Sequence, residues 1–149
     1  MTVTSAGARF SGASCAIDGS SRDALEAARV LARTLGMHPI HVSGDRRALY
    51  HAAASMASNF LITLEDAAER LAGPCGVDRA ALAPLVRASA TNWIDLGAAG
   101  ALTGPLSRGD DLTATRQRAA VQEAAPDLLP LWDALSHATR ALVARSQSK

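Results

Sequence analysis

Short polar side chains recur along the segment 50–59, and they are the part of the sequence best suited to chemistry. At about 100° per residue in a helix, His51, Ser55, Ser58 and Asn59 fall on one side. Histidine exchanges a proton near pH 7, because its unperturbed pKa is about 6.5. Asparagine offers a donor and an acceptor to a substrate carbonyl or hydroxyl. These residue types make His51, Ser55 and Asn59, with the neighbouring Tyr50, candidates for a surface that binds a small molecule.

The same segment has a second interpretation that the pattern leaves open. Leu49, Met56 and Phe60 lie on the opposite side of the helix, as an ordinary core face would. In an alanine-rich helix, small polar side chains also allow a neighbouring helix to pack closely. The pattern alone does not choose between a binding surface and a helix contact.

A glycine-rich segment, 97–110, is the second candidate for binding. Its glycines permit close approach of the backbone, and Thr103 and Arg108 carry donors for an anionic or carbonyl group. We predict both as substrate-binding residues. A purely structural interpretation stands beside this one, because Gly97 is typical of a helix stop and Asp110 of a helix N-cap.

Composition excludes several classes of function. The chain has 149 residues, 48% of them hydrophobic but only 3% aromatic, which favours helices packed through small side chains. A net charge of +1 gives no field that would attract nucleic acid or an anionic membrane. We identify no apolar stretch long enough to span a bilayer and no signal peptide. Cys15 and Cys75 match no metal or redox spacing, so we expect a cytoplasmic protein with reduced thiols.

The elements that must position the candidate residues begin with a strand, a helix and a strand. Residues 13–17 and 39–42 read as short strands, and a helix over 22–35 starts at a serine cap and ends at Gly36. Such a βαβ unit makes its two strands parallel. A parallel sheet of two strands is marginal in water, so these strands require a sheet that the rest of the sequence does not offer.

From Ser43 onward the sequence predicts helices. We expect a long helix to about Ala72, another from near Pro84 to Leu96, and a structured loop over 97–109. Two further helices follow, over 110–124 and 126–145. No G-x-G-x-x-G segment follows a strand, and no cluster of metal ligands occurs, so we predict neither cofactor-binding nor metal-binding residues in this chain.

Several short motifs together resemble a known family. They are Leu49-Tyr50-His51-Ala52-Ala53-Ala54, Ala57-Ser58-Asn59, Asn92, Ala101-Leu102-Thr103-Gly104-Pro105 and Arg108-Gly109-Asp110 with Thr113. They resemble the C-terminal domain of bacterial Rossmann-like proteins called domain of unknown function 2520. That domain is related to the C-terminal domains of 6-phosphogluconate, ketopantoate and pyrroline-5-carboxylate reductases. The resemblance extends over roughly residues 10–143.

The resemblance implies a mainly α fold, a helical bundle like the C-terminal domain of 6-phosphogluconate dehydrogenase, with a short N-terminal βαβ remnant. It implies a flexible arm over 1–12, a βαβ segment over 13–43 that docks on a Rossmann sheet, and a helical substrate and dimerisation domain over 44–146. Related reductases place a lysine and an asparagine on the first long helix. Asn59 fits the asparagine, but no lysine lies between His51 and Asn59, so His51 is the substitute candidate. With the resemblance included, we predict His51 and Asn59 as catalytic residues, and Tyr50, Ser55 and Asn92 as substrate-binding residues beside Thr103 and Arg108.

The functional expectation follows from these features. We expect the substrate-binding and dimerisation domain of an NAD(P)-dependent oxidoreductase-like protein, acting on a small polar substrate. The chain alone binds no cofactor in this interpretation, because NAD(P) belongs to a Rossmann domain. Either a separate partner supplies that domain, and this chain alone is not expected to catalyse, or the chain has lost the redox role. The alternative is a non-catalytic helical homodimer that acts as a scaffold or small-ligand sensor.

Overall fold

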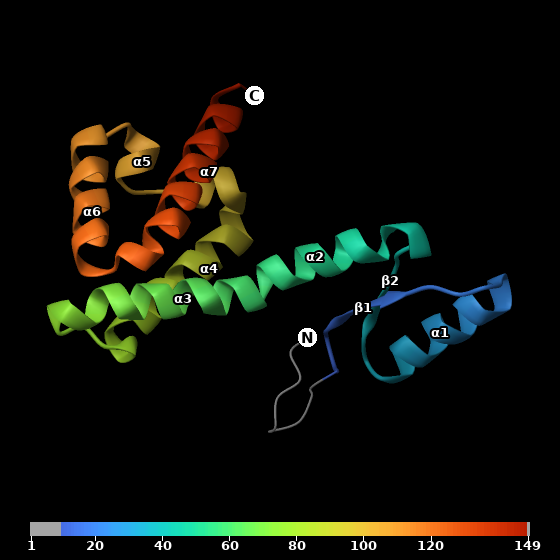
Figure 1. Ribbon diagram of the computed structural model, residues 1–149. Coiled ribbons are helices and arrows are strands. Elements are labelled where there is room, and N and C mark those ends of the chain that lie inside the picture. Colours follow the sequence, from blue (N-terminus) through green and yellow to red (C-terminus); the bar gives the residue numbers. More distant parts are fainter. Residues whose placement is uncertain (1–9, 149) are drawn as a thin grey trace. The chain divides into compact units, whose positions relative to one another are not determined.

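The computed structural model describes residues 10–148 and divides the chain into two compact units, residues 1–63 and 64–149 (Figure 1). We call them the first and the second unit and describe each by itself. Most of the described residues are helical, which confirms the expected mainly α fold class with a short N-terminal βαβ segment. The predicted arm over 1–12 lies largely outside the described residues.

The first unit begins with the expected βαβ segment. Strand β1 (Ser14–Ile17), helix α1 (Arg22–Thr34) and strand β2 (His38–His41) form a parallel two-stranded sheet with a helix against it. The Ser21 hydroxyl caps α1 by accepting the N–H of Ala24 at 3.1 Å. The turn after the helix contains Gly36 at a φ of 72°, which glycine adopts without strain. Local sequence signals therefore set both ends of α1.

A small apolar core holds this segment together. Ile17 at the end of β1, Ala32 on α1 and Met37 before β2 are buried, with partly buried apolar residues around them. Alternation along a strand points Ile17 and Cys15 toward α1 and leaves Ala16 on the other face. Because Ala16 and Ile40 are exposed, that other face of the sheet is open.

The long helix expected up to about Ala72 is interrupted. A short 3₁₀ turn (Gly44–Arg46) leads into α2 (Arg47–Ala57), and α3 (Asn59–Ala72) follows after Ser58. Ser58 has φ −128° and ψ −75°, outside the helical region, and its hydroxyl donates to the Ala54 carbonyl at 2.7 Å. A side-chain hydrogen bond of this kind competes with the helical backbone pattern and is associated with bends. The prediction of one continuous helix was wrong at this residue.

The second unit is built from helices. From Leu64 it contains the rest of α3, then a 3₁₀ turn (Gly73–Cys75), α4 (Arg79–Ala101), α5 (Pro105–Arg108), α6 (Asp111–Ala124), a second 3₁₀ turn (Pro126–Leu128) and α7 (Leu129–Gln147). Helix α4 begins five residues earlier than expected, because Asp78 caps it by accepting the N–H of Ala81 at 2.9 Å. The segment expected as a loop is partly helical. α4 continues to Ala101 around a break at Gly97, and α5 follows.

Ion pairs join the helices of the second unit. Arg79 donates to both carboxylate oxygens of Glu69, at 2.6 and 2.9 Å, and Arg118 does the same to Asp133, at 2.8 and 2.7 Å. Arg70 pairs with Asp127 at 2.7 Å. The hydrogen bonds from arginine hold the pKa values of Glu69, Asp127 and Asp133 below the usual range. Within residues 10–148, no helix combines the length and apolar character needed to cross a bilayer.

Candidate functional site

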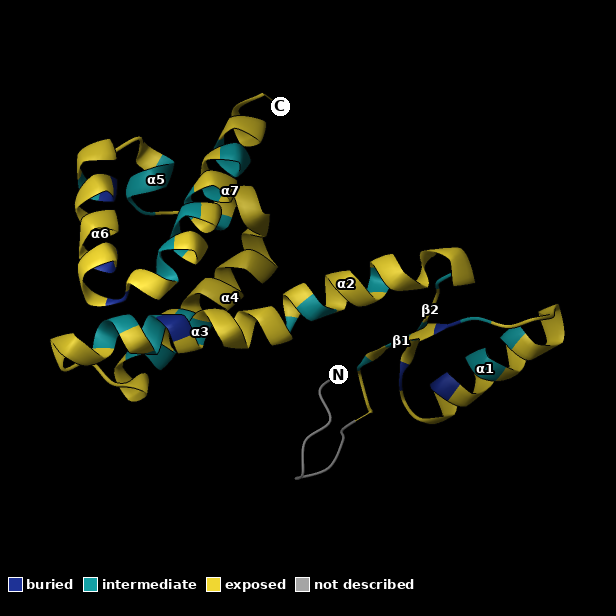
Figure 2. Ribbon diagram, viewed as in Figure 1, coloured by how far each residue is buried: buried dark blue, intermediate teal, exposed yellow. Residues whose placement is uncertain are grey.

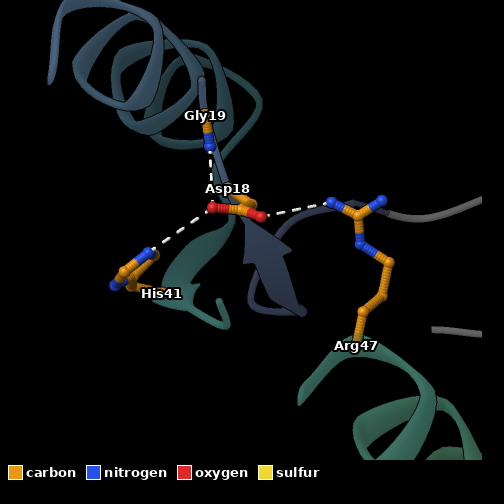
Figure 3. A network of polar contacts seen from close by, with 4 residues as sticks. All are labelled: Asp18, Gly19, His41 and Arg47. Carbon is orange, nitrogen blue, oxygen red and sulfur yellow. Dashed lines mark hydrogen bonds and ion pairs between the residues drawn. The ribbon is translucent and has the colours of Figure 1, made fainter. Parts of the chain in front are cut away.

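The carboxyl ends of β1 and β2 carry a polar cluster centred on Asp18 (Figure 3). The Asp18 carboxylate accepts the N–H of Gly19 at 2.9 Å and an N–H of Arg47 at 3.2 Å. Its other neighbour is the Nε2 of His41, at 3.6 Å, an ion pair when that ring is protonated. This carboxylate links β1, β2 and the start of α2 at the edge of the sheet where parallel strands end.

A small hollow adjoins that cluster. Its volume is about 140 Å³, and its lining combines Asp18, Arg47, Tyr50 and His51 with apolar side chains of the strand ends. The rings of Tyr50 and His51 lie 5.9 Å apart, inclined at 52°. Ligands of open α/β sheets bind outside the carboxyl ends of the strands. The hollow is the size of a small functional group rather than of a whole cofactor, because drug-sized sites occupy about 300–1,000 Å³.

The structure brings only part of the predicted polar stripe to this hollow. Tyr50 is half-buried and His51 exposed, and both line it. Ser55 and Ser58 are half-buried and Asn59 is exposed, but among the described residues none of the three belongs to the lining. Asn59 lies beyond the break at Ser58, so the regular helical spacing used to place it beside His51 does not hold across that point.

The side of α2 opposite the stripe is open. Figure 2 shows α2 exposed over most of its length, and Leu49 and Met56, expected as part of a core face, are 72% and 67% exposed. Phe60, the third residue of that expected face, belongs to α3 and is 60% exposed. Within the first unit the polar side of α2 therefore borders the strand ends, while the apolar side contacts no core. The second interpretation of the sequence expected an ordinary core on this apolar side. Within the first unit no core covers it.

Two members of the cluster, Asp18 and Arg47, were missed as site residues. Neither residue is among the candidates that the sequence pattern indicates, since Asp18 follows a short strand and Arg47 lies near the start of a predicted helix. A signal was present for Asp18, because an acid directly after a predicted parallel strand lies at the binding edge of a sheet. For Arg47 the signal was absent, since its partner lies 29 positions away in the sequence.

The remaining predicted site residues belong to the second unit. Asn92 is exposed on α4, Thr103 is exposed between α4 and α5, and Arg108 is the exposed last residue of α5. The helix start near Arg108 is already capped, because Asp110 accepts the N–H of Thr113 at 3.0 Å. Hydrogen bonds from Thr113 hold the pKa of Asp110 below its usual value. The structural role expected for Asp110 is confirmed, and it weakens the case for an anion at that helix end.

The described residues do not fit a dinucleotide. A Rossmann turn needs glycines that let a pyrophosphate approach a helix N-terminus. After β1 that position holds the Asp18 carboxylate, whose charge repels a phosphate, and the Ala24 N–H in the first turn of α1 is already bonded to the Ser21 hydroxyl. A side chain at Gly19 would also lie 2.5 Å from the Leu25 nitrogen, so the turn is closely packed. No step involving the nucleotide is assigned to these residues.

The second unit contains a hollow of its own that the sequence did not indicate. It measures about 210 Å³ and lies among apolar side chains of α3, α5, α6 and α7, including Leu71, Leu106 and Trp132. Its polar lining residues are Ser136 and Thr139. Such a hollow suits an apolar group and offers no obvious acid–base chemistry.

Known proteins match the chain at the level of family and fold. Residues 13–139 match the model of the Domain of unknown function (DUF2520). The solved structure of the "putative NADP oxidoreductase BF3122" from Bacteroides fragilis matches 91% of this chain and 52% of its own, at 21% identity and a TM-score of 0.79. The solved structure of protein TM1727 from Thermotoga maritima matches 85% of this chain and 52% of its own, at 23% identity and a TM-score of 0.75. The chain thus spans about half the length of these structures. No curated protein matches the sequence.

Proposed function

Because the chain belongs to the family Domain of unknown function (DUF2520), we propose that it is the substrate-binding and dimerisation part of an NAD(P)-dependent oxidoreductase. In this proposal residues 13–43 dock on a Rossmann domain that holds the nucleotide, and residues 44–146 provide substrate contacts and the dimer interface. The substrate is a small polar carbonyl or imine compound. The observation that carries the proposal is the polar hollow at the strand ends, with Tyr50 and His51 in its wall.

His51 is the proton-transfer residue of the proposal. It is exposed at the rim of a hollow that already contains a carboxylate and a guanidinium, so a small polar group entering there meets complementary charges. At a distance of about 3 Å its imidazole would donate a proton to, or accept one from, the carbonyl oxygen or imine nitrogen. Asp18 holds Arg47 in place, and Tyr50 contributes a hydroxyl for orientation. Asn59 and Ser55, together with Asn92, Thr103 and Arg108, remain predicted substrate contacts.

The dimer part of the proposal rests on α4. Every residue from 87 to 100 is exposed, Trp93 and Leu96 among them (Figure 2). Leu85, Trp93 and Leu96 fall within about 80° of one another around the helix, and we call them the α4 face. Large apolar side chains exposed together on one side of a helix favour an interaction site. A second copy of the chain is the partner we assign to it.

The experiment joins this chain to a nucleotide domain. The part of the Thermotoga maritima protein that the chain does not match is fused in front of residue 1, the order implied by the family resemblance. NADPH oxidation is then followed with aldehydes, 2-oxo acids and cyclic imines. For a compound that the fusion reduces, His51→Ala is expected to lower kcat about 10²–10⁴-fold and to change KM much less, because general acid–base catalysis contributes that much to the rate.

A matched histidine serves as control. His38 is also exposed, lies on β2 and is not part of the hollow, so His38→Ala should leave kcat and KM unchanged. Unchanged turnover in His51→Ala would remove His51 from the mechanism. Failure of the fusion to oxidise NADPH with any of these compounds would count against the oxidoreductase proposal.

A small-ligand sensor is the second candidate, and the apolar hollow of the second unit favours it. Its volume of about 210 Å³ and its apolar lining suit a small apolar molecule. Trp132 lies in the lining, so its fluorescence reports occupancy. Saturable quenching by a small apolar quencher that does not itself fluoresce, such as bromobenzene, together with no binding of NADPH by the fusion, would favour the sensor over the enzyme.

A further inference from the structure

The two edges of the β1–β2 sheet are chemically different, and the hydrogen-bond register shows how. The N–H of His38 donates to the Ala13 carbonyl at 2.8 Å, and the N–H of Val42 donates to the Ile17 carbonyl at 3.1 Å. With Ser14 opposite His38 and Ala16 opposite Ile40, alternate residues of each strand face the partner strand. On β1, residues 13, 15 and 17 therefore face β2, and on β2, residues 38, 40 and 42 face β1.

The remaining backbone groups point away from the sheet. On β1 these belong to Ser14 and Ala16, and on β2 to Pro39 and His41. Among the described residues, no hydrogen bond is formed by the outward N–H of Ser14 or Ala16, and the Ala16 carbonyl receives only the Cys15 thiol, at 3.8 Å. The outer edge of β1 thus offers an intact row of donors and acceptors.

The outer edge of β2 is interrupted at its centre. Pro39 has no N–H, so of the two outward positions on this strand only His41 has a donor. Proline inside a sheet is confined to edge strands, with the missing donor on the solvent side. A further strand would lose a ladder hydrogen bond at Pro39 but none on β1. Edge strands are commonly protected against unwanted pairing in this way.

We propose that the outer edge of β1, at Ser14 and Ala16, pairs with a parallel strand of another domain's sheet, and that β2 is the outermost strand of the completed sheet. Parallel strands occur almost only in larger sheets covered on both faces, and here Ile40 and Ala16 are exposed on the uncovered face. The solved structures matched by the chain are about twice as long as the matched region, which leaves room for such a sheet. That the partner is a Rossmann domain rests on the proposed function.

This arrangement places the candidate hollow at the ligand edge. A strand parallel to β1 ends on the same side of the sheet as Ile17, directly before Asp18. Ligands of open α/β sheets bind at that side. The incoming strand would therefore bring the binding edge of its own domain to the side on which Asp18, Tyr50 and His51 line the hollow. Pairing along β2 would instead put the new strand beyond Pro39.

The test uses the fusion with the unmatched part of the Thermotoga maritima protein and compares it with the full free chain. Covalent linkage gives an effective concentration in the millimolar range, so weak pairing also forms. Amide exchange is followed by NMR. The Ser14 and Ala16 amides should exchange at least tenfold more slowly in the fusion than in the free chain, and the His41 amide should exchange equally fast in both.

Two proline variants give the matched control. Ala16→Pro and His41→Pro each remove an outward N–H that makes no hydrogen bond within the sheet, so both are compatible with its ladder. Protection of Cys15 and Ile17 in the free chains checks that each variant keeps the sheet. Ala16→Pro should abolish the added protection at Ser14 in the fusion, and His41→Pro should preserve it.

Contrary outcomes are distinct. Slowed exchange at His41 instead of Ser14 and Ala16, or no slowing at either edge, would overturn the proposal. Slowing at Ser14 and Ala16 in the free chain that rises with concentration would assign the edge to a second copy. Protection of β1 without NADPH oxidation would keep the pairing and remove the oxidoreductase function. NADPH oxidation together with slowed exchange at the outer edge of β2 would keep the oxidoreductase function and remove the pairing along β1.

Discussion

The two units leave different kinds of surface unsatisfied. The first unit leaves a strand edge open, where backbone groups of Ser14 and Ala16 have no partner among the described residues, in addition to the exposed apolar side of α2. In the second unit the open surface is the α4 face of Leu85, Trp93 and Leu96, which are 65%, 60% and 61% exposed. Backbone pairing is directional but gains little net free energy, because water satisfies the same groups. Apolar burial gains more but is non-directional.

This difference suggests a division of labour. A strand edge fixes register and orientation, which suits docking to a domain that must present its ligand edge accurately. An apolar helix face supplies affinity, which suits association of two copies. The units also differ in what holds them together, since the first combines a small apolar core with the polar cluster at Asp18, and the second has ion pairs between its helical segments.

A large effect on self-association is expected at the α4 face. Trp93→Glu should weaken self-association about 30-fold or more, because loss of a central aromatic residue typically costs at least about 2 kcal/mol of binding free energy. Sedimentation velocity over a concentration series measures it. Ile94 is equally open, at 71% exposure, but points about 100° away from Trp93 around the helix. Ile94→Glu should therefore leave the association unchanged. Equal effects of both variants would contradict the assignment of this face.

A core substitution tests whether the first unit stands by itself. Met37 is 8% exposed, and Met37→Ala should destabilise the first unit by about 2–5 kcal/mol, the usual cost of truncating a buried methionine. Amide exchange on β1 and α1 should quicken while that of α6 and α7 stays the same. Met56→Ala is the control, because Met56 is 67% exposed, and it should change stability by less than about 0.5 kcal/mol. Equal loosening of α6 and α7 would show that the units unfold together.

The smallest expected effect is that of acid on the thermal stability of the second unit. The arginine partners of Glu69, Asp127 and Asp133 lower the pKa of each carboxyl in the folded state. A lowered pKa stabilises the fold above the unfolded value, near pH 4, and this contribution is lost as the pH falls through the lower folded value. Thermal unfolding of α6 and α7 between pH 6 and pH 2.5 should therefore shift modestly downward, since these pairs are exposed.

A variant isolates this contribution. Glu69→Gln removes the charge that pairs with Arg79, so its unfolding temperature should depend less on pH than that of the original chain over the same interval. An unfolding temperature that rises as the pH falls would show that the Glu69–Arg79 pair makes no contribution. The same would follow if the unfolding temperature of Glu69→Gln depended on pH as strongly as that of the original chain.

The sequence by itself determined the features that depend on neighbours in the chain. A serine cap before α1, a stop at Gly36 and a cap at Asp110 were predicted because capping uses residues within a few positions, and the structure confirms each, with Ser21 as the serine. The parallel βαβ segment was predictable for the same reason, since a short crossover permits few topologies. Helix α4 was placed too late, because Pro84 was taken as its start and the cap at Asp78 was overlooked.

Only the tertiary structure decided which side chains meet. It joined Asp18 to Arg47 across 29 positions, brought Tyr50 and His51 to the same hollow, and left Asn59 beyond a break. Helical spacing assumes a regular helix, and the hydrogen bond from Ser58 to Ala54 ends that regularity. The sequence likewise did not reveal which strand edge is intact, because that depends on the register that turns the Pro39 nitrogen outward.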